Sequence, residues 1–198
     1  MKSDIQKNSH NLKTKIIDAT AEMKKCHQEV LKHLDGLQNL KETIIKKNLP
    51  VSAIKNEWDK FNDFANTSLL LHTRDEEQAL FPLLEPKLCN HACIGTGSIT
   101  PVEMMMTDHK NIHAAIEVIN YLTKLLGKKE VSNELSFVLK NEMAARMAMI
   151  IKTMRNHIWK EDNVLYQIAR SELSFEELDK VSQKMVVFRS QSDFICLH

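Results

Sequence analysis

The chain has 198 residues, a length that fits one domain and is sufficient to bury a good core. Its four glycines and four prolines leave little turn chemistry for a β-sandwich or barrel. The formal net charge is +1 and neither half is strongly basic or acidic, so nothing indicates binding to nucleic acid or to an anionic membrane surface. Frequent Lys, Glu, Leu, Ile, Ala and Met favour helices. We therefore predict an all-α protein with a single domain over residues 1–198 (core about 12–188), which contacts neither nucleic acid nor a membrane.

The N-terminal stretch Met1–Asn8 lacks the apolar core of a signal peptide, and no uncharged run reaches the length that spans a bilayer. The four cysteines are scattered and form no disulfide framework. We therefore expect a cytoplasmic protein. Cys89, His91 and Cys93 share a predicted loop, but a structural zinc site would need a fourth ligand.

Apolar residues at helical spacing predict a first long helix from Leu12 to about Lys47, which ends before Pro50. A second helix is expected to begin near Ser52 as its N-cap. This helix should fade between Pro82 and Pro86, because proline removes a backbone donor and clashes with the preceding turn.

A loop is expected from residue 87 to residue 100. A third helix then begins around Pro101, a favoured residue of the first turn, and Gly127 stops it. A fourth, long helix begins after Ser132 and continues to about residue 169.

A shorter fifth helix opens with the capping box Ser174-Phe175-Glu176-Glu177 and continues to about Phe188. Four long helices with mostly short connections predict an up-down-up-down four-helix bundle, followed by this short C-terminal helix. Metal sites in such bundles are built in the core from side chains of facing helices.

Three pairs of potential metal ligands share a spacing of four residues. They are His72 and Glu76, His109 and His113, and His157 and Glu161. On a helix this spacing places both side chains on one face, with about 5–6 Å between their Cβ atoms. Both members can then touch one metal, or a carboxylate can bridge two metals. One such pair would be weak support for a site, but three on separate helices are hard to dismiss.

Imidazole and carboxylate are the ligands that iron prefers in oxygen-reactive, non-haem sites. Two Fe(II) ions bring four positive charges, two bridging carboxylates halve that charge, and neutral histidines complete the shells. A lone core-facing histidine is more often a hydrogen-bonded core residue than a ligand. A cluster of imidazoles in a bundle core, however, leaves ring nitrogens without partners unless a metal is present.

The segments that carry the pairs resemble the hemerythrin-like HHE cation-binding family. They read His72-x3-Glu76-Glu77-x3-Phe81-Pro82, Asp108-His109 and His157-Ile158-x2-Glu161-x3-Leu165. The resemblance covers the chain from about Ile16 to Met185. It implies a four-helix bundle around a carboxylate-bridged centre of two non-haem iron ions. The ligands that it implies are His27, His72, Glu76, His109, His157 and Glu161.

Two of the helices leave alternatives for their ligands. On the first helix His33 flanks the apolar stripe about as closely as His27, and only the family pattern selects His27. On the third helix His113 lies about 40° round from His109 and one turn further, so it can reach the same metal. We expect His113 as a fifth histidine ligand, with a hydrogen bond to a ligand as the alternative.

The fourth helix offers two carboxylates after His157. Glu161 lies about 40° round the helix from this histidine and Asp162 about 140° round, so Glu161 is expected to be the bridge. Asp162 is expected to lie outside the ligand set, next to a ligand or facing solvent. The simplest interpretation of three other charged residues is that they face solvent: Asp75, Glu77 and Lys160.

The first functional hypothesis is a di-iron protein that binds a diatomic ligand, O2 or NO, for sensing, storage or detoxification. The alternative is a di-iron redox enzyme for NO reduction, peroxide decomposition or iron-centre repair, which would use a redox partner protein. A third class is a metal-stapled interaction or iron-storage bundle. Ligand identity separates these classes poorly, because pocket polarity and access control reactivity.

Overall fold

The computed structural model describes residues 18–47, 49–92 and 99–191, and every regular element in these ranges is helical, which confirms the all-α class. The helices are α1 (Ala19–Lys46), α2 (Val51–Phe64), α3 (Leu70–Asp75), α4 (Phe81–Ala92), α5 (Pro101–Leu126), α6 (Asn133–Lys160), α7 (Tyr166–Glu172) and α8 (Phe175–Gln191). The Cys89–Cys93 segment lies outside the described side chains. Within the described ranges, no helix combines the length and apolar character needed to cross a membrane.

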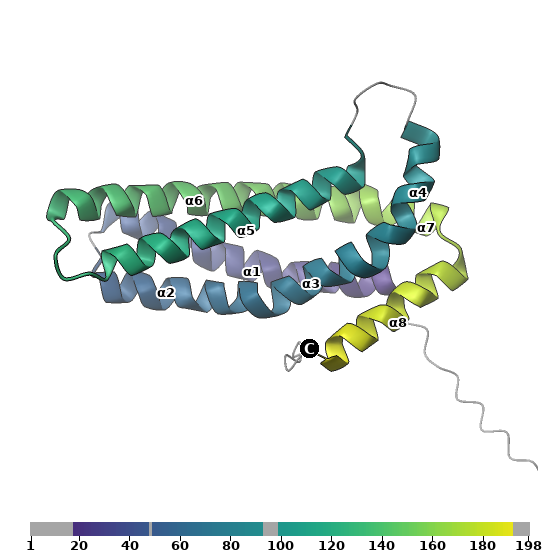
Figure 1. Cartoon of the computed structure of the whole chain (residues 1–198), viewed down its shortest axis with the longest axis horizontal. Helices are drawn as coiled ribbons and strands as arrows, with labels where there is room; N and C mark the ends of the chain where they lie inside the picture. The colour runs from purple at the N-terminus through teal and green to yellow at the C-terminus, as the bar shows by residue number, and fades with distance from the viewer. Residues whose placement is uncertain (1–17, 48, 93–98, 192–198) are drawn as a thin grey trace, which may run out of the picture.

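Short π-helical turns join several of these helices into longer continuous runs. They are η1 (Ala65–Leu69), η2 (Glu76–Leu80) and η3 (Glu161–Leu165). The first run therefore passes from α2 through α3 to α4, and the second passes from α6 into α7. Figure 1 shows α1, the α2–α4 run, α5 and α6 side by side, with α8 crossing at the end nearest α4 and α7. Helix α1 packs against α2 and α6, and α5 also packs against both, so the long helices enclose a common interior.

Capping residues fix most helix starts where the sequence predicts them. Helix α5 begins at Pro101, one residue after the cap Thr100, and Gly127 is its C-terminal cap as predicted. Ser132 caps α6, and its hydroxyl accepts a hydrogen bond from a backbone N–H of the first turn. At the start of α8 the hydroxyl of Ser174 accepts from the N–H of Glu177, whose carboxylate accepts from the N–H of Ser174.

The first two helices begin at different residues from those predicted. The side chain of Asp18 caps α1, and residues 12–17 lie outside the described residues. Helix α2 begins at Val51, so Ser52 lies inside its first turn and is not the N-cap. The reason is that Pro50, in an extended conformation, presents its carbonyl to the N–H groups of Ala53 and Ile54.

The predicted end of the second helix between Pro82 and Pro86 is wrong, because α4 continues through both prolines to Ala92. A proline inside a helix costs about 3 kcal/mol, whereas burial of a large apolar side chain gains about 1.5–3 kcal/mol. Four side chains in this stretch are buried: Leu80, Phe81, Leu84 and Leu88. Their combined burial offsets the cost of two prolines, and the predicted loop correspondingly begins later.

Two apolar cores occupy the interior, with a polar layer between them. The distal core lies among α1, α2, α5 and α6, around Leu34, Ile54, Trp58, Ile119, Met143 and Met147. The proximal core lies where α4, α7 and α8 meet α1 and α5, around Met23, Leu80, Leu84, Met105, Leu165 and Val181. On α1 the buried His27 lies between Met23 of the proximal core and Val30 of the distal core. On α5 His109 lies between Met105 of the proximal core and Ile112 of the distal core.

Candidate metal centre

The polar layer gathers six side chains from the long helical runs. They are His27 of α1, His72 of α3, Glu76 of η2, His109 of α5, His157 of α6 and Glu161 of η3. They form two groups, each with two histidines and both glutamates, and within each group the ligand atoms lie within 4.8 Å of one another. We call these groups the α1/α3 half (His27, His72) and the α5/α6 half (His109, His157). Glu76 and Glu161 belong to both halves and are fully buried.

Each shared glutamate begins a π-helical turn. The N–H of Phe81 bonds to the carbonyl of Glu76, and the N–H of Tyr166 bonds to the carbonyl of Glu161, each five residues back. A π turn inserts an extra residue into an α-helix and is frequent at functional sites. The residue five positions after each glutamate is therefore brought next to it, which directs the Tyr166 side chain into the layer.

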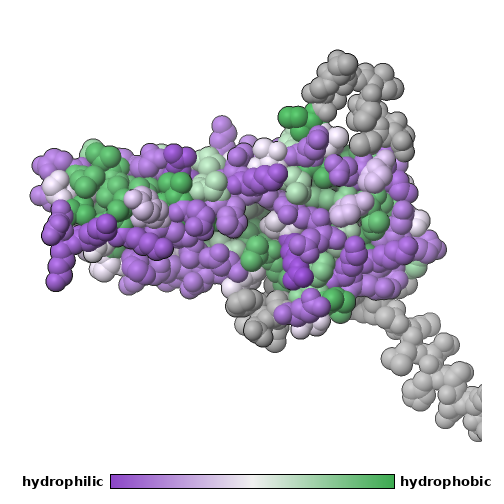
Figure 2. Space-filling view, in the orientation of Figure 1, coloured by the Kyte–Doolittle hydropathy of each residue, from purple (hydrophilic) through white to green (hydrophobic). Residues whose placement is uncertain are grey.

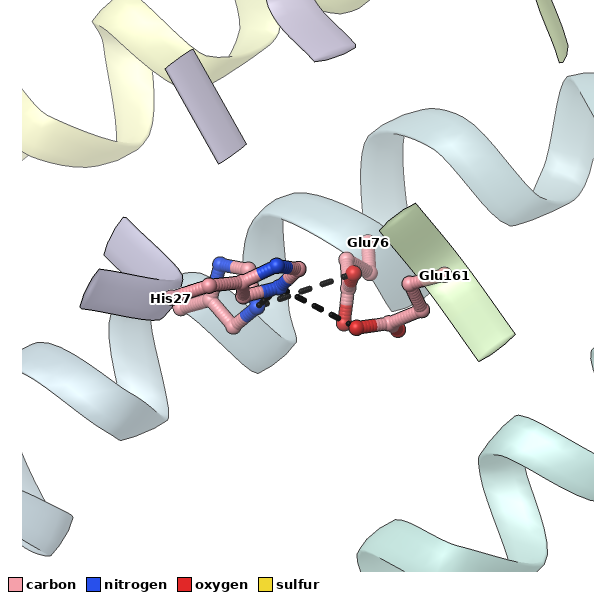
Figure 3. Close-up of side chains that lie close together, drawn as sticks. His27, Glu76 and Glu161 are labelled. Carbon is pink, nitrogen blue, oxygen red and sulfur yellow. Dashed lines mark hydrogen bonds and ion pairs between the residues drawn. The ribbon is translucent and has the colours of Figure 1, made fainter. Parts of the chain in front are cut away.

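In the α1/α3 half, the two imidazoles and the carboxylates meet through their inner atoms. The Nε2 atoms of His27 and His72 are 3.1 Å apart. His27 Nε2 lies 3.1 Å from Oε2 of Glu161, and His72 Nε2 lies 3.7 Å from Oε1 of Glu76. Figure 3 shows His27 directed at the two carboxylates.

The α5/α6 half repeats this arrangement with the other carboxylate oxygens. The Nε2 atoms of His109 and His157 are 3.1 Å apart. His109 Nε2 lies 3.4 Å from Oε2 of Glu76, and His157 Nε2 lies 2.8 Å from Oε1 of Glu161. Each glutamate thus directs one oxygen to each half, which is the arrangement of a bridging carboxylate.

These separations fit atoms that share a cation. Two ligand atoms bound at about 2.1 Å and about 90–110° apart on one metal lie about 3.0–3.4 Å from each other. Hydrogen bonding accounts for the layer poorly, since Oε2 of Glu76 and both oxygens of Glu161 have no hydrogen-bond partner among the described residues. Buried carboxylate oxygens that lie close to ring nitrogens without hydrogen-bond alignment are expected where a metal draws them together. The buried layer can therefore hold a metal ion.

Outer hydrogen bonds orient two of the four histidines, His27 and His109. Asp162 Oδ1 lies 2.9 Å from Nδ1 of His27, and Glu77 Oε1 lies 2.8 Å from Nδ1 of His109. Asp108 lies 3.5 Å from Nδ1 of His157, which is an ion-pair separation without a hydrogen bond. A carboxylate on the outer nitrogen fixes the ring and directs Nε2 inward, as in many metal sites. His72 Nδ1 has no hydrogen-bond partner among the described residues.

Three charged residues expected to face solvent instead make contacts between helices. Glu77 contacts His109 as described, and Lys160 donates to Asp108 at 3.0 Å. Asp75 is 1% exposed and accepts a hydrogen bond from Arg189 of α8 at 3.3 Å. Burial raises the pKa of Asp75 to about 6, although the neighbouring Arg189 lowers it. Helical spacing alone could not predict the burial of Asp75, because it results from α8, which covers a face of α3 that would otherwise be exposed.

The structure does not bring His113 or His33 to the centre. His113 is exposed and belongs to neither group, so the expectation of a fifth histidine ligand is not met. His113 lies one turn beyond His109 on α5, in the part of the helix whose buried residues Ile112 and Ile116 belong to the distal core. His33 stacks on Phe64 with ring centroids 3.7 Å apart. His27 is therefore the histidine of α1 that lies in the layer.

Sequence analysis missed Tyr166 as part of the site. Its hydroxyl donates to Oε1 of Glu76 at 2.6 Å and lies 3.4 Å from Nε2 of His27, and its ring stacks on His27. Burial, together with the charge of Glu76, raises the pKa of Tyr166 well above its usual value. The signal available in the sequence was its position five residues after Glu161, which becomes a neighbouring position only across a π turn.

The electrostatics of the layer follow from two carboxylates in a buried place. Burial holds the pKa of His72 down to about 3, despite the charge of Glu76. Burial is the largest single effect on His157 and disfavours its charged form, but Glu161, Asp108 and Glu76 together outweigh it and raise the pKa of His157 to about 10. The pKa of Glu161 falls well below its usual range, because the nearby histidines outweigh the effect of burial. The layer thus attracts positive charge, either as protons on imidazoles or as metal ions.

Comparison with protein-family models, curated proteins and solved structures found no match for this chain. Any functional assignment therefore depends on the geometry of the layer and on the sequence motifs.

Proposed function

We propose that this chain is a hemerythrin-like, non-haem di-iron protein whose centre binds a diatomic ligand, O2 or NO. The observation that carries the proposal is that Glu76 and Glu161 each direct one oxygen to the α1/α3 half and the other to the α5/α6 half. Two cations that share both carboxylates account for all four of these oxygen positions. The scaffold that we propose for this centre is an up-down-up-down four-helix bundle.

The donor set supports iron. Each half offers two imidazoles and two carboxylates and includes no cysteine. Histidine with carboxylate is the ligand combination of oxygen-reactive non-haem iron, whereas thiolate-rich sites select zinc or iron–sulfur clusters. His27, His72, His109 and His157 would hold the ions terminally, and Glu76 and Glu161 would bridge them. Bound iron would supply a redox-active centre that takes up a small ligand.

The surrounding residues would exclude water and keep the ligands oriented. Leu69, Ile112 and Met154 on the distal side of the layer are buried, and so are Met23 and Leu80 on the proximal side. The carboxylates on Nδ1 of His27 and His109 keep these imidazoles with Nε2 directed inward. A dry pocket with complete ligands suits reversible binding for sensing, storage or detoxification.

A di-iron redox enzyme is the second candidate, and two observations favour it. His113 lies outside the layer, so each half offers only two histidines and keeps more open positions than a half with three imidazoles would. The phenol O–H of Tyr166 also lies directly on a bridging carboxylate. Such an enzyme would turn over NO or peroxide, or repair iron centres, with a redox partner protein as electron donor.

Anaerobic reconstitution with Fe(II) tests the proposal and separates the candidates. We expect two iron ions per chain by elemental analysis, and optical spectra that change on addition of O2 or NO. A change that reverses on removal of the gas supports the binding protein. Consumption of NO or peroxide without a stable spectral change supports the enzyme. One metal or fewer per chain at saturation, or zinc binding without affinity for iron, contradicts both.

A further inference from the structure

We propose that small ligands reach the centre at its α5/α6 half, through a pocket between α3 and α5, while the phenol of Tyr166 closes the α1/α3 half. This inference rests on the proposed function, because it specifies where that centre takes up its ligand. It assigns unequal roles to two halves that have the same donor set.

The pocket has a volume of about 260 Å³ and extends from the surface to a histidine of the layer. Its rim includes the exposed residues Leu70, Lys110 and His113, and its wall includes the buried Met154. His109, of the α5/α6 half, also lines it. No histidine of the α1/α3 half is among the described residues that line this pocket. Figure 2 shows hydrophobic side chains at the surface in the region between α3 and α5.

The size of the pocket restricts its occupant. Sites for drug-sized ligands have volumes of about 300–1,000 Å³, and one water molecule occupies about 30 Å³. The pocket of about 260 Å³ therefore has room for a diatomic molecule or a compact anion and lies below the volume range of sites for drug-sized ligands. Its wall is mainly apolar, which favours a neutral molecule such as O2 or NO, and Lys110 at the rim allows a small anion to approach.

The α1/α3 half is closed by a side chain of the proximal core. Tyr166 is 3% exposed, and its hydroxyl lies within 3.4 Å of His27 Nε2 and within 2.6 Å of Glu76 Oε1. These are the separations of atoms around one coordination sphere, so the hydroxyl occupies the space that a small ligand would need on this half. Asp162, behind His27, covers the outer side of the same imidazole.

A neighbouring pocket provides an internal comparison. It lies between α4 and α5 and is lined by Glu77, Phe81, Glu103, Thr107 and Lys110, among others. It shares Glu77 and Lys110 with the first pocket, but no histidine of the layer is among its described lining residues. A ligand in this second pocket would meet Glu77 and would not reach a ligand nitrogen. A bulky residue there should leave ligand uptake unchanged.

The test measures azide binding to the iron-loaded, oxidised protein by stopped-flow absorbance of the azide charge-transfer band. Thr73→Trp fills the wall of the first pocket, and Thr107→Trp places the same change in the second pocket. We expect azide association to slow at least tenfold in Thr73→Trp and to stay unchanged in Thr107→Trp. Because Thr73 is next to His72, His113→Trp at the exposed rim provides an independent variant with the same expected direction.

Tyr166→Phe tests the closed half. Removal of the hydroxyl should raise the azide stoichiometry from one to two per centre, while iron content stays at that of the unmodified protein. Equal association rates in all three tryptophan variants, or an azide stoichiometry unchanged by Tyr166→Phe, would overturn the inference. Neither result would affect the proposed function, which instead fails if the chain does not bind two irons.

Discussion

The distal core and the polar layer lie along the same helices, but different interactions hold them together. The distal core is apolar, and the polar contacts at its edge are neutral hydrogen bonds such as that from Trp58 Nε1 to Asn120 at 2.8 Å. The layer a few residues further along buries two carboxylates and three imidazoles, and its fourth imidazole, that of His109, is half-buried. Apolar burial stabilises at about 25 cal/mol per Å² without any ligand. A buried carboxylate costs free energy unless positive charge lies beside it.

The distal core therefore needs no ligand for its stability, whereas the stability of the layer should depend on the positive charge that it binds. We expect that damage to the distal core leaves metal binding intact, and that removal of metal leaves the distal core folded. Metal content and stability, measured together in variants of each region, distinguish these two expectations.

The largest effect is expected from loss of a bridging carboxylate. Glu161→Ala and Glu76→Ala should each lower the metal content from two per chain to none, because each glutamate contacts both halves. Elemental analysis after desalting checks this. Glu85→Ala, on α4 and outside both groups, is the control and should keep two metals. Loss of a single metal would show that the altered carboxylate is a terminal ligand and not a bridge.

Removal of metal by a chelator should be the next largest effect. A ligand that binds only the native state stabilises it by about 4 kcal/mol at a thousandfold excess over Kd. For a domain of this size 1 kcal/mol corresponds to about 2–4 °C in Tm. We therefore expect a fall of about 8–16 °C on chelation, measured by calorimetry, with full recovery on reloading. An unchanged Tm would place the metal at the periphery of the fold.

Damage to the distal core should have the opposite pattern of effects, with a loss of stability and no change in metal content. Met147 is fully buried there, and truncation of such a side chain leaves a cavity. Met147→Ala should lower the free energy of unfolding by about 2–5 kcal/mol, with metal content unchanged. Denaturant unfolding at saturating metal gives the first quantity and elemental analysis the second. Loss of metal in this variant would show that the two regions are coupled.

The same division separates what the sequence predicts from what it does not. The distal core follows helical periodicity, and caps at Ser132 and Gly127 confirm predicted helix boundaries. The proline rule failed at Pro82 and Pro86, because the cost of a proline is local whereas the burial that outweighs it involves α8 and other distant elements. Local rules cannot evaluate packing between segments that are far apart in sequence.

Within the layer, the His-x3-Glu spacing correctly groups residues on one helix face, since side chains four apart are neighbours in an α-helix. It could not place Tyr166, which depends on a π turn after Glu161. The spacing of four also predicted His113 as a fifth histidine ligand, which the structure does not place in the layer. Such a spacing shows which helix face two residues share, but not where along the helix the layer ends. The contact of Glu77 with Nδ1 of His109 depends on how α5 packs, so the sequence around Glu77 alone cannot predict it.

Protons and metal should compete for the layer, which gives a smaller, pH-dependent effect. The folded pKa of His157 is about 10, above the ordinary value of 6.5, so its protonation stabilises the metal-free fold fully below pH 6.5. That stabilisation is lost as the pH rises towards 10, while metal affinity rises because the proton that must leave His157 competes less strongly with the metal. The Tm difference between loaded and chelated protein should therefore widen from pH 6.5 upwards. A difference independent of pH would mean that no proton leaves on metal binding.

The smallest effect is expected from the outer hydrogen bonds, and it also tests the assignment on η3. Asp162 accepts from Nδ1 of His27, and loss of such a partner lowers metal affinity about 10–100-fold, or about 1.4–2.7 kcal/mol. Asp162→Ala should therefore keep two metals at saturation but release them at a lower chelator concentration. His113→Ala, outside both groups, is the control and should match the unmodified protein. Full iron in Glu161→Ala with loss of iron in Asp162→Ala would reverse the roles of these adjacent carboxylates.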